Sequence, residues 1–178
     1  DRILLTDIDD VLFQDNPFLI KCDKLYATEE SCLLNNYGGP RNSYNWPNRL
    51  NLDWICQALA ANYKIENNGD KKAPSRFKDE VISWNANVIN CGTILGDYNQ
   101  IMHWLDFYYN INKATGCVRA QGIFMCYCLY SYPDNVQINN NKESLILTGC
   151  DCRIQDFSIS KNDNVTIENK NNEKFIIV

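Results

Sequence analysis

Residues 3–18 read I-L-L-T-D-I-D-D-V-L-F-Q-D-N-P-F. The apolar run at 3–5 is typical of a buried strand. Three carboxylates follow it within four positions, Asp7, Asp9 and Asp10. Like charges at this spacing repel one another, and a bound divalent cation that prefers oxygen ligands relieves the repulsion. The stretch therefore predicts a strand that ends at a metal site, with a solvated acidic turn as the structural alternative.

Length and composition favour one soluble globular domain. The chain has 178 residues, of which 45% are hydrophobic and 22% are charged, so a sizeable core can form. A net charge of −5 argues against a nucleic acid or an anionic membrane as a partner. No apolar run approaches the ~20 residues that a membrane span needs. Because the chain begins at Asp1, without Met, we expect residues 1–178 to be a single domain truncated at both ends.

The nine cysteines do not form a zinc-binding pattern. Two C-x-C pairs, 126–128 and 150–152, replace the C-x-x-C spacing of structural zinc sites, and the chain has one histidine. Buried free thiols or one or two disulfides are the favoured interpretation. Together with the glycosylation sequon at 164–166, the cysteines favour the lumen of the secretory pathway, with membrane anchoring through a missing N-terminal segment as an option.

Helix and strand patterns alternate along the first 135 residues. Residues 24–28 predict a strand that ends at Glu29 and Glu30, and the Asn-, Gly- and Pro-rich stretch 35–47 predicts a loop. A helix is expected from an Asn48 cap to about residue 62. Its apolar face carries Leu52, Ile55, Cys56 and Leu59.

The stretch 88–108 is the second informative one. It predicts a strand at 88–89, a turn at 90–92, an extended piece ending at Gly96 and a helix capped by Asp97. Gly92 and Gly96 either serve as ordinary turn residues or let a ligand approach the backbone closely. His103, the single histidine, is interpreted as a helix-surface or core residue rather than a catalytic base.

A further helix is predicted over 118–130, ended by Pro133, and short strands are predicted at 144–147, 165–167 and 175–178. The whole pattern indicates an α/β domain with a mostly parallel, mixed sheet flanked by helices. The expected core consists of Ile3, Leu4, Leu5, Val11, Phe13, Ile55, Leu59, Val88, Ile89, Trp104, Leu105, Phe124 and Tyr127.

Three segments together resemble the nucleotide-sugar-dependent glycosyltransferases of the GT-A type. T-D-I-D-D-V-L-F-Q-D-N-P-F (6–18) resembles the D-x-D or D-x-x-D metal motif with its F-Q-x-x-P-F tail. V-I-N-C-G-T-I-L-G (88–96) resembles the N-x-G-x-x-x-G segment, and A-Q-G-I-F (120–124) resembles a D-Q-G segment. Their order and separations match over most of residues 4–130, and the resemblance implies a GT-A fold.

The resemblance implies roles for individual residues. Asp7 and Asp9 would hold Mn2+ or Mg2+ on the diphosphate of a nucleotide-sugar donor, and Asp10 would replace Asp9 in the D-x-x-D spacing. Asn90 and Gly92 would line the sugar or acceptor pocket. Gln121 would lie near the transferred sugar, and the acceptor would be a glycan, a protein or a lipid.

Two departures from the family pattern are visible. Ala120 stands where relatives carry Asp, and the family's late metal-binding histidine has no counterpart before Val178. The catalytic base is therefore left unassigned, with Asp97, Asp151 and Glu30 as possibilities. The Ala120 position also favours a second interpretation, a glycosyltransferase-like domain that binds its ligands without turnover.

A different family shares the first motif. D-I-D-D-V-L resembles the hydrophobic-D-x-D-G-V-L motif of phosphatases of the haloacid dehalogenase type, with Asp10 in place of the glycine. In that alternative Asp7 is the nucleophile, Asp9 the general acid and Mg2+ the cofactor. The glycosyltransferase is the favoured prediction because three segments support it rather than one.

Overall fold

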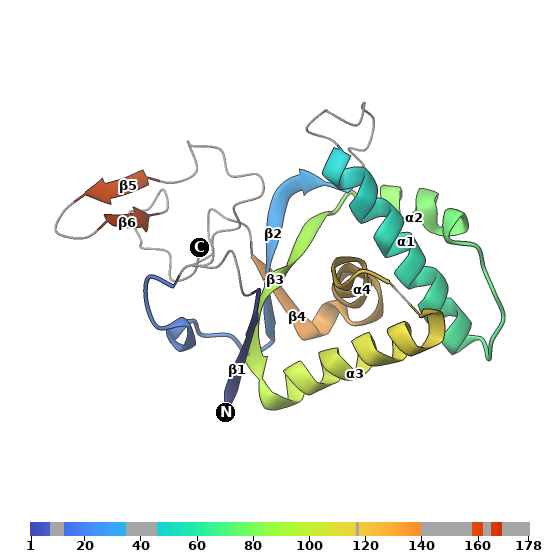
Figure 1. The fold of residues 1–178 in the computed structure, drawn as a ribbon, viewed down its shortest axis with the longest axis horizontal. Coiled ribbons are helices and arrows are strands. Elements are labelled where there is room, and N and C mark those ends of the chain that lie inside the picture. Colours follow the sequence, from blue (N-terminus) through green and yellow to red (C-terminus); the bar gives the residue numbers. More distant parts are fainter. Residues whose placement is uncertain (8–12, 35–45, 117, 140–157, 162–164, 169–178) are drawn as a thin grey trace.

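The computed structural model describes residues 1–7, 13–34, 46–116, 118–139, 158–161 and 165–168. Figure 1 shows a sheet with its helices gathered on one side. The strands are β1 (Arg2–Thr6), β2 (Leu25–Leu33), β3 (Asn87–Asp97), β4 (Val136–Asn139), β5 (Ser158–Lys161) and β6 (Val165–Glu168). The α-helices are α1 (Trp46–Glu66), α2 (Lys78–Ser83), α3 (Tyr98–Thr115) and α4 (Ala120–Cys126), and short helical turns occupy Pro17–Leu19, Pro74–Phe77, Tyr127–Ser131 and Pro133–Asn135.

The main sheet has four strands in the order β1-β3-β2-β4. The strand β3 runs antiparallel to both of its neighbours, and β2 pairs with β4 in parallel. The α/β class and the mixed sheet are confirmed. The expectation of mostly parallel pairing is wrong, because β3 lies between β1 and β2 and runs against them. Since β1, β2 and β4 share one direction, their C-terminal ends still lie at the same end of the sheet.

The strand β1 lies at the edge of the sheet, so its apolar residues 3–5 are only half-buried rather than fully buried. Its first residue fixes the segment that follows. The Arg2 guanidinium donates hydrogen bonds to the carbonyl oxygens of Phe18, at 3.3 Å, and of Ile20. These hydrogen bonds hold the segment around Ile20 over the sheet face that faces away from the helices, where Ile20 is buried.

The strand β3 supplies both hydrophobic cores. Ile94 packs into the large core on the helix side, and Leu95 packs into a smaller one with Ile20 and Tyr26. Adjacent strand residues point to opposite faces, which explains why one short apolar run serves two layers. The turn expected at 90–92 is wrong, since β3 runs without interruption from Asn87 to Asp97.

The two long helices follow the apolar periodicity of the sequence. The predicted face of α1 is buried, whereas its start is Trp46, so Asn48 lies inside the first turn and is not the cap. In α3 the predicted Asp97 cap is confirmed, because its side chain accepts from Gln100 N at 2.9 Å and the Gln100 side chain accepts from Asp97 N at 2.9 Å. Leu105 is 36% exposed and does not join the core.

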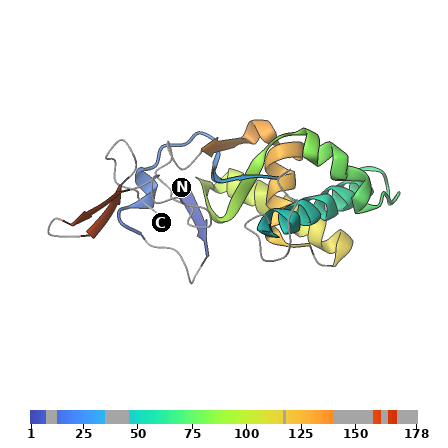
Figure 2. The same ribbon diagram turned by 90° about the horizontal axis from the view of Figure 1, so that it is seen from above.

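The helix α4 lies between the sheet and the two long helices, and its residues Gly122–Cys126 are all buried (Figures 1 and 2). The expected single helix over 118–130 ends instead in a π-helical turn at Tyr127–Ser131. A Cβ atom at Gly122 would lie 2.5 Å from the backbone of Trp54. The absence of a side chain at Gly122 therefore sets how closely α1 and α4 approach.

The remaining sequence predictions concern the hydrophobic core, the C-terminal strands and the number of domains. Phe13 is 44% exposed and, like Leu105, lies outside the core, while the other described members of the expected core are half-buried or buried. The expected strand at 165–167 corresponds to β6, which pairs with β5 in a hairpin that the sequence pattern missed. Val11 and the strands expected at 144–147 and 175–178 lie outside the described residues. The single-domain organisation stays a prediction.

The contact between α1 and α4 gives a testable consequence. Gly122→Ala is expected to lower the free energy of unfolding by about 3 kcal/mol, because the new methyl group meets backbone atoms that cannot rotate away. Gly116→Ala serves as the matched control. Gly116 has φ of +83° and open space around it, so alanine there costs only about 1 kcal/mol of backbone strain. Urea denaturation measures both, and equal losses would contradict this packing.

Candidate functional site

Asp7 follows β1 directly and is anchored to β3 by its backbone. Its N–H donates to the Gly92 carbonyl oxygen at 2.8 Å, which continues the β1–β3 ladder by one residue beyond Thr6. The Asp7 side chain is exposed at the C-terminal end of β1. The first predicted motif is therefore joined to the second by a backbone hydrogen bond.

Gly92 allows that close approach. A Cβ atom at this position would lie 2.6 Å from Asp7 Oδ2 and 3.0 Å from Asn90 Oδ1. Real Cβ atoms do not tolerate such contacts, so any side chain here would displace the Asp7 carboxylate. Of the two roles considered for this glycine, the structure supports close approach, although by a protein carboxylate rather than by a ligand.

The backbone around Gly92 is irregular and is held by side chains. Between the pairs Tyr26–Leu95 and Thr28–Asn90, β2 advances by two residues and β3 by five, which marks a bulge. Bulges of this kind redirect side chains and are common beside active sites. The Asn90 side chain accepts from Gly92 N at 2.7 Å, so its oxygen is already used within the strand.

Gln121, from α4, binds the same stretch of β3. Its side-chain oxygen accepts from Cys91 N at 3.1 Å, and its amide nitrogen donates to the Ile89 carbonyl oxygen. The carboxamide thus behaves like a peptide group of a neighbouring strand. Both of these hydrogen bonds go to backbone, and the predicted place of Gln121 near a transferred sugar stays a prediction.

Glu30 is the second carboxylate in the candidate site, after Asp7. It lies in β2, is 8% exposed and accepts from Asn90 Nδ2 at 3.3 Å. Of the three candidate bases from the sequence, Asp97 is used as the cap of α3 and Asp151 lies outside the described residues. Glu30 is therefore the candidate that the fold brings to the site. The sequence pattern did not distinguish it, because its proximity depends on the register between β2 and β3.

The local electrostatic field is negative. Burial is the largest of the causes that raise the pKa of the Cys91 thiol to about 12; the carboxylates of Asp7 and Glu30 act in the same direction, and a backbone hydrogen bond acts against them. A thiol in this setting stays protonated and does not act as a nucleophile. The same field would favour a bound cation.

The predicted metal ligands lie partly outside the described residues. Asp9 and Asp10 lie there, and among the described residues no group of three or more His, Cys, Asp or Glu side chains could hold a metal ion. What the described site does offer is the exposed carboxylate of Asp7, an oxygen donor at the end of β1. Oxygen donors suit Mn2+ or Mg2+ better than Zn2+, so the residues present fit the predicted ion in donor type.

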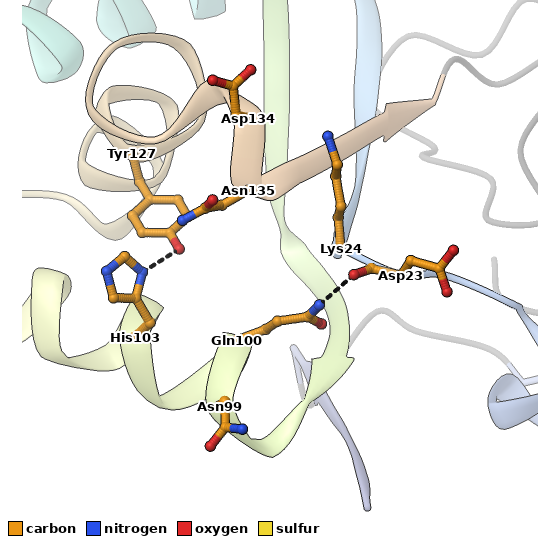
Figure 3. Close-up of a pocket in the computed structure, with 8 residues that line it drawn as sticks. All are labelled: Asp23, Lys24, Asn99, Gln100, His103, Tyr127, Asp134 and Asn135. Carbon is orange, nitrogen blue, oxygen red and sulfur yellow. Dashed lines mark hydrogen bonds between the residues drawn. The ribbon is translucent and has the colours of Figure 1, made fainter.

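A separate polar pocket of about 300 Å3 lies at the opposite end of the sheet (Figure 3). His103, exposed on α3 as expected for a surface histidine, lines it together with Tyr127. Its Nδ1 lies 2.8 Å from the Tyr127 hydroxyl. Burial raises the pKa of Tyr127 to about 12, so this phenol keeps its proton at neutral pH.

The chain was compared with protein-family models, with curated proteins and with solved structures. None of the three comparisons gives a match. Within the part of the chain that the structure describes, no helix is both long enough and apolar enough to cross a bilayer. The functional argument therefore rests on the geometry of the chain itself.

The role of Gln121 can be tested by stability. Gln121→Leu is expected to cost about 2–4 kcal/mol of unfolding free energy, since it leaves the Cys91 N–H and the Ile89 carbonyl without partners. Gln57→Leu, at an exposed position of α1, is the control and should change stability by about 0.5 kcal/mol or less. Similar values for the two variants in urea denaturation would contradict the bridging role.

The raised pKa of Cys91 predicts slow alkylation. At pH 8 a thiol with pKa about 12 is thiolate in roughly one molecule in ten thousand, against about one in ten for the ordinary value of 9.0. Iodoacetamide labelling followed by peptide mass spectrometry should modify the partly buried Cys22 before Cys91 in the native protein. In urea the two rates should converge, and rapid native labelling of Cys91 would refute this environment.

Proposed function

We propose that this chain is a metal-dependent glycosyltransferase domain, which moves a sugar from a nucleotide-diphosphate sugar to an acceptor hydroxyl. The observation that carries the proposal is the pairing of Asp7 with Gly92. Three sequence segments that resemble glycosyltransferase motifs, around residues 7, 90 and 121, converge on the same four-residue stretch of β3. The resemblance rests on sequence segments alone, so their convergence in space is independent support for the proposal.

The proposed metal ligands are Asp7 and Asp9, with Asp10 as the alternative to Asp9. When bound, Mn2+ or Mg2+ acts as a Lewis acid that stabilises the charge developing on the departing diphosphate. The protein's own contribution begins with Gly92, which leaves room for the Asp7 carboxylate, and with the Asp7–Gly92 hydrogen bond, which fixes the position of its backbone. A preorganised carboxylate loses little entropy when it receives its ligand.

Glu30 is the proposed general base toward the acceptor hydroxyl. It is buried, it lies on the strand next to the bulge, and Asn90 orients it by a hydrogen bond. A carboxylate in this position can accept the proton that the acceptor loses as the glycosidic bond forms. Gln121 acts indirectly, because its hydrogen bonds fix the backbone on which Asn90 and Gly92 sit.

A second candidate is a domain that binds nucleotide sugar without transfer. Ala120 favours it. This residue is exposed at the first position of α4, beside Gln121, where the related enzymes carry a carboxylate. In this alternative the metal and the nucleotide still bind, while the acid that would assist transfer is missing.

The deciding experiment is Mn2+-dependent turnover of a panel of nucleotide sugars, with p-nitrophenyl phosphate as a parallel substrate. Asp7→Ala should lower the rate at least about a hundredfold, because it removes a ligand whose charge acts on the transition state. Glu30→Gln should lower turnover while Mn2+ still binds. Asp106→Ala, an exposed carboxylate on α3, is the control and should leave the rate unchanged.

Each outcome separates the candidates. Turnover of one nucleotide sugar that EDTA and Asp7→Ala abolish supports the transferase and identifies the donor. Cleavage of the aryl phosphate alone supports the phosphatase alternative, with Asp7 as nucleophile. Binding of Mn2+ and nucleotide without turnover supports the binding domain, and an absence of both binding and turnover overturns the proposal.

A further inference from the structure

The pocket in Figure 3 is a candidate ligand site of its own. It is formed by residues just before β2, just before β4, along the first turns of α3 and at the start of the π-helical turn Tyr127–Ser131. Its volume of about 300 Å3 is at the lower end of the range for small-molecule sites. All of the lining residues are polar: Asp23, Lys24, Asn99, Gln100, His103, Tyr127, Asp134 and Asn135.

A hydrogen bond between two lining side chains forms one wall. The Tyr127 hydroxyl lies 2.8 Å from His103 Nδ1, within hydrogen-bond distance. This contact fixes the orientation of the His103 ring beside the pocket.

The wall is rigid. The Tyr127 side chain is 1% exposed, and its ring is enclosed by edge contacts with Trp104 and Phe107. The His103 ring stacks edge-on against Tyr132, with ring centroids 4.5 Å apart. Gln100 is also fixed, because its amide donates to the Asp23 carbonyl oxygen at 2.8 Å.

The other side retains uncommitted polar groups. Among the described residues, no partner is recorded for the side chains of Lys24, Asn99 and Asp134, which are exposed around the opening. They offer an ammonium, an amide and a carboxylate, hence both donors and acceptors. Figure 3 shows Lys24 and Asp134 at the upper rim of the pocket and Asn99 below it.

The chemistry of this lining restricts the ligand. No aliphatic side chain lines the pocket, and two carboxylates with one ammonium argue against phosphate or another strong anion. A hydroxyl group donates and accepts at once, so several hydroxyls on one small ring match mixed amides and carboxylates. We propose that this pocket binds a neutral polyhydroxylated ligand of monosaccharide size.

The inference does not rest on the proposed transferase activity. The two sites lie at opposite ends of β2, with Lys24 just before the strand and Glu30 within its second half. Six residues of extended chain separate them by roughly 20 Å. The pocket therefore needs neither the metal nor the nucleotide, and it can bind a sugar whether or not the other site is active.

The test uses His103 as a reporter, because it is the single histidine in the chain. Imidazole 1H–15N correlation spectra of the 15N-labelled protein, recorded without metal, give the reference positions of the His103 resonances. Methyl hexopyranosides and myo-inositol are then titrated, with inorganic phosphate and cyclohexanol as the comparison ligands. At least one polyol should shift the His103 resonances saturably at millimolar concentration, and phosphate and cyclohexanol should not.

Variants of the lining residues test whether the shift of the His103 resonances arises from binding in the pocket. Asn99→Ala and Lys24→Ala should each weaken binding about three- to tenfold, the effect of losing one hydrogen bond. Lys113→Ala, an exposed residue near the other end of α3, is the control and should bind normally. No polyol shift, a shift that does not saturate, a response to phosphate or cyclohexanol, or equal affinity in all three variants would overturn the proposal.

Discussion

The hydrogen bonding of the β3 backbone between Ile89 and Gly92 is the constraint on which the rest of this structure depends. A bulge shifts the pairing of this stretch with β2, yet buried backbone groups must still find partners. Two of the partners are side chains, those of Asn90 and Gln121, and the third is the backbone of Asp7, which extends the β1–β3 ladder by one residue. The polar residues of the candidate site therefore lie together because they supply hydrogen bonds to the irregular backbone of β3.

The sequence was informative where structure depends on local periodicity. Apolar spacing located α1 and α3, and Asp97 was recognisable as a cap because its hydrogen bonds stay within four residues. The sequence was misleading at Gly92, where an Asn–Cys–Gly stretch has the composition of a turn but forms the middle of a strand. The direction of β3 had no local signal, because pairing partners are set by contacts between distant segments.

The candidate site, like the fold, was predictable from the sequence only in part. Asp7, Asn90, Gly92 and Gln121 were selected by resemblance, and the fold brings them together. Their interactions were not predictable, since the Gln121 bonds to Cys91 and Ile89 depend on how closely α4 packs against the sheet. The pocket beside His103 was not predicted from the sequence, because its eight lining residues come from four separate segments without a shared motif.

The strand β3 contributes Ile94 to one hydrophobic core and Leu95 to the other. Neither core can therefore open while the other stays intact, because opening either one removes support from the strand they share. Local unfolding of the helical layer should propagate through β3 to the opposite face, so that the two layers behave as one cooperative unit. The slowest-exchanging amides of the protein are then expected in the middle of this strand rather than in its longest helix.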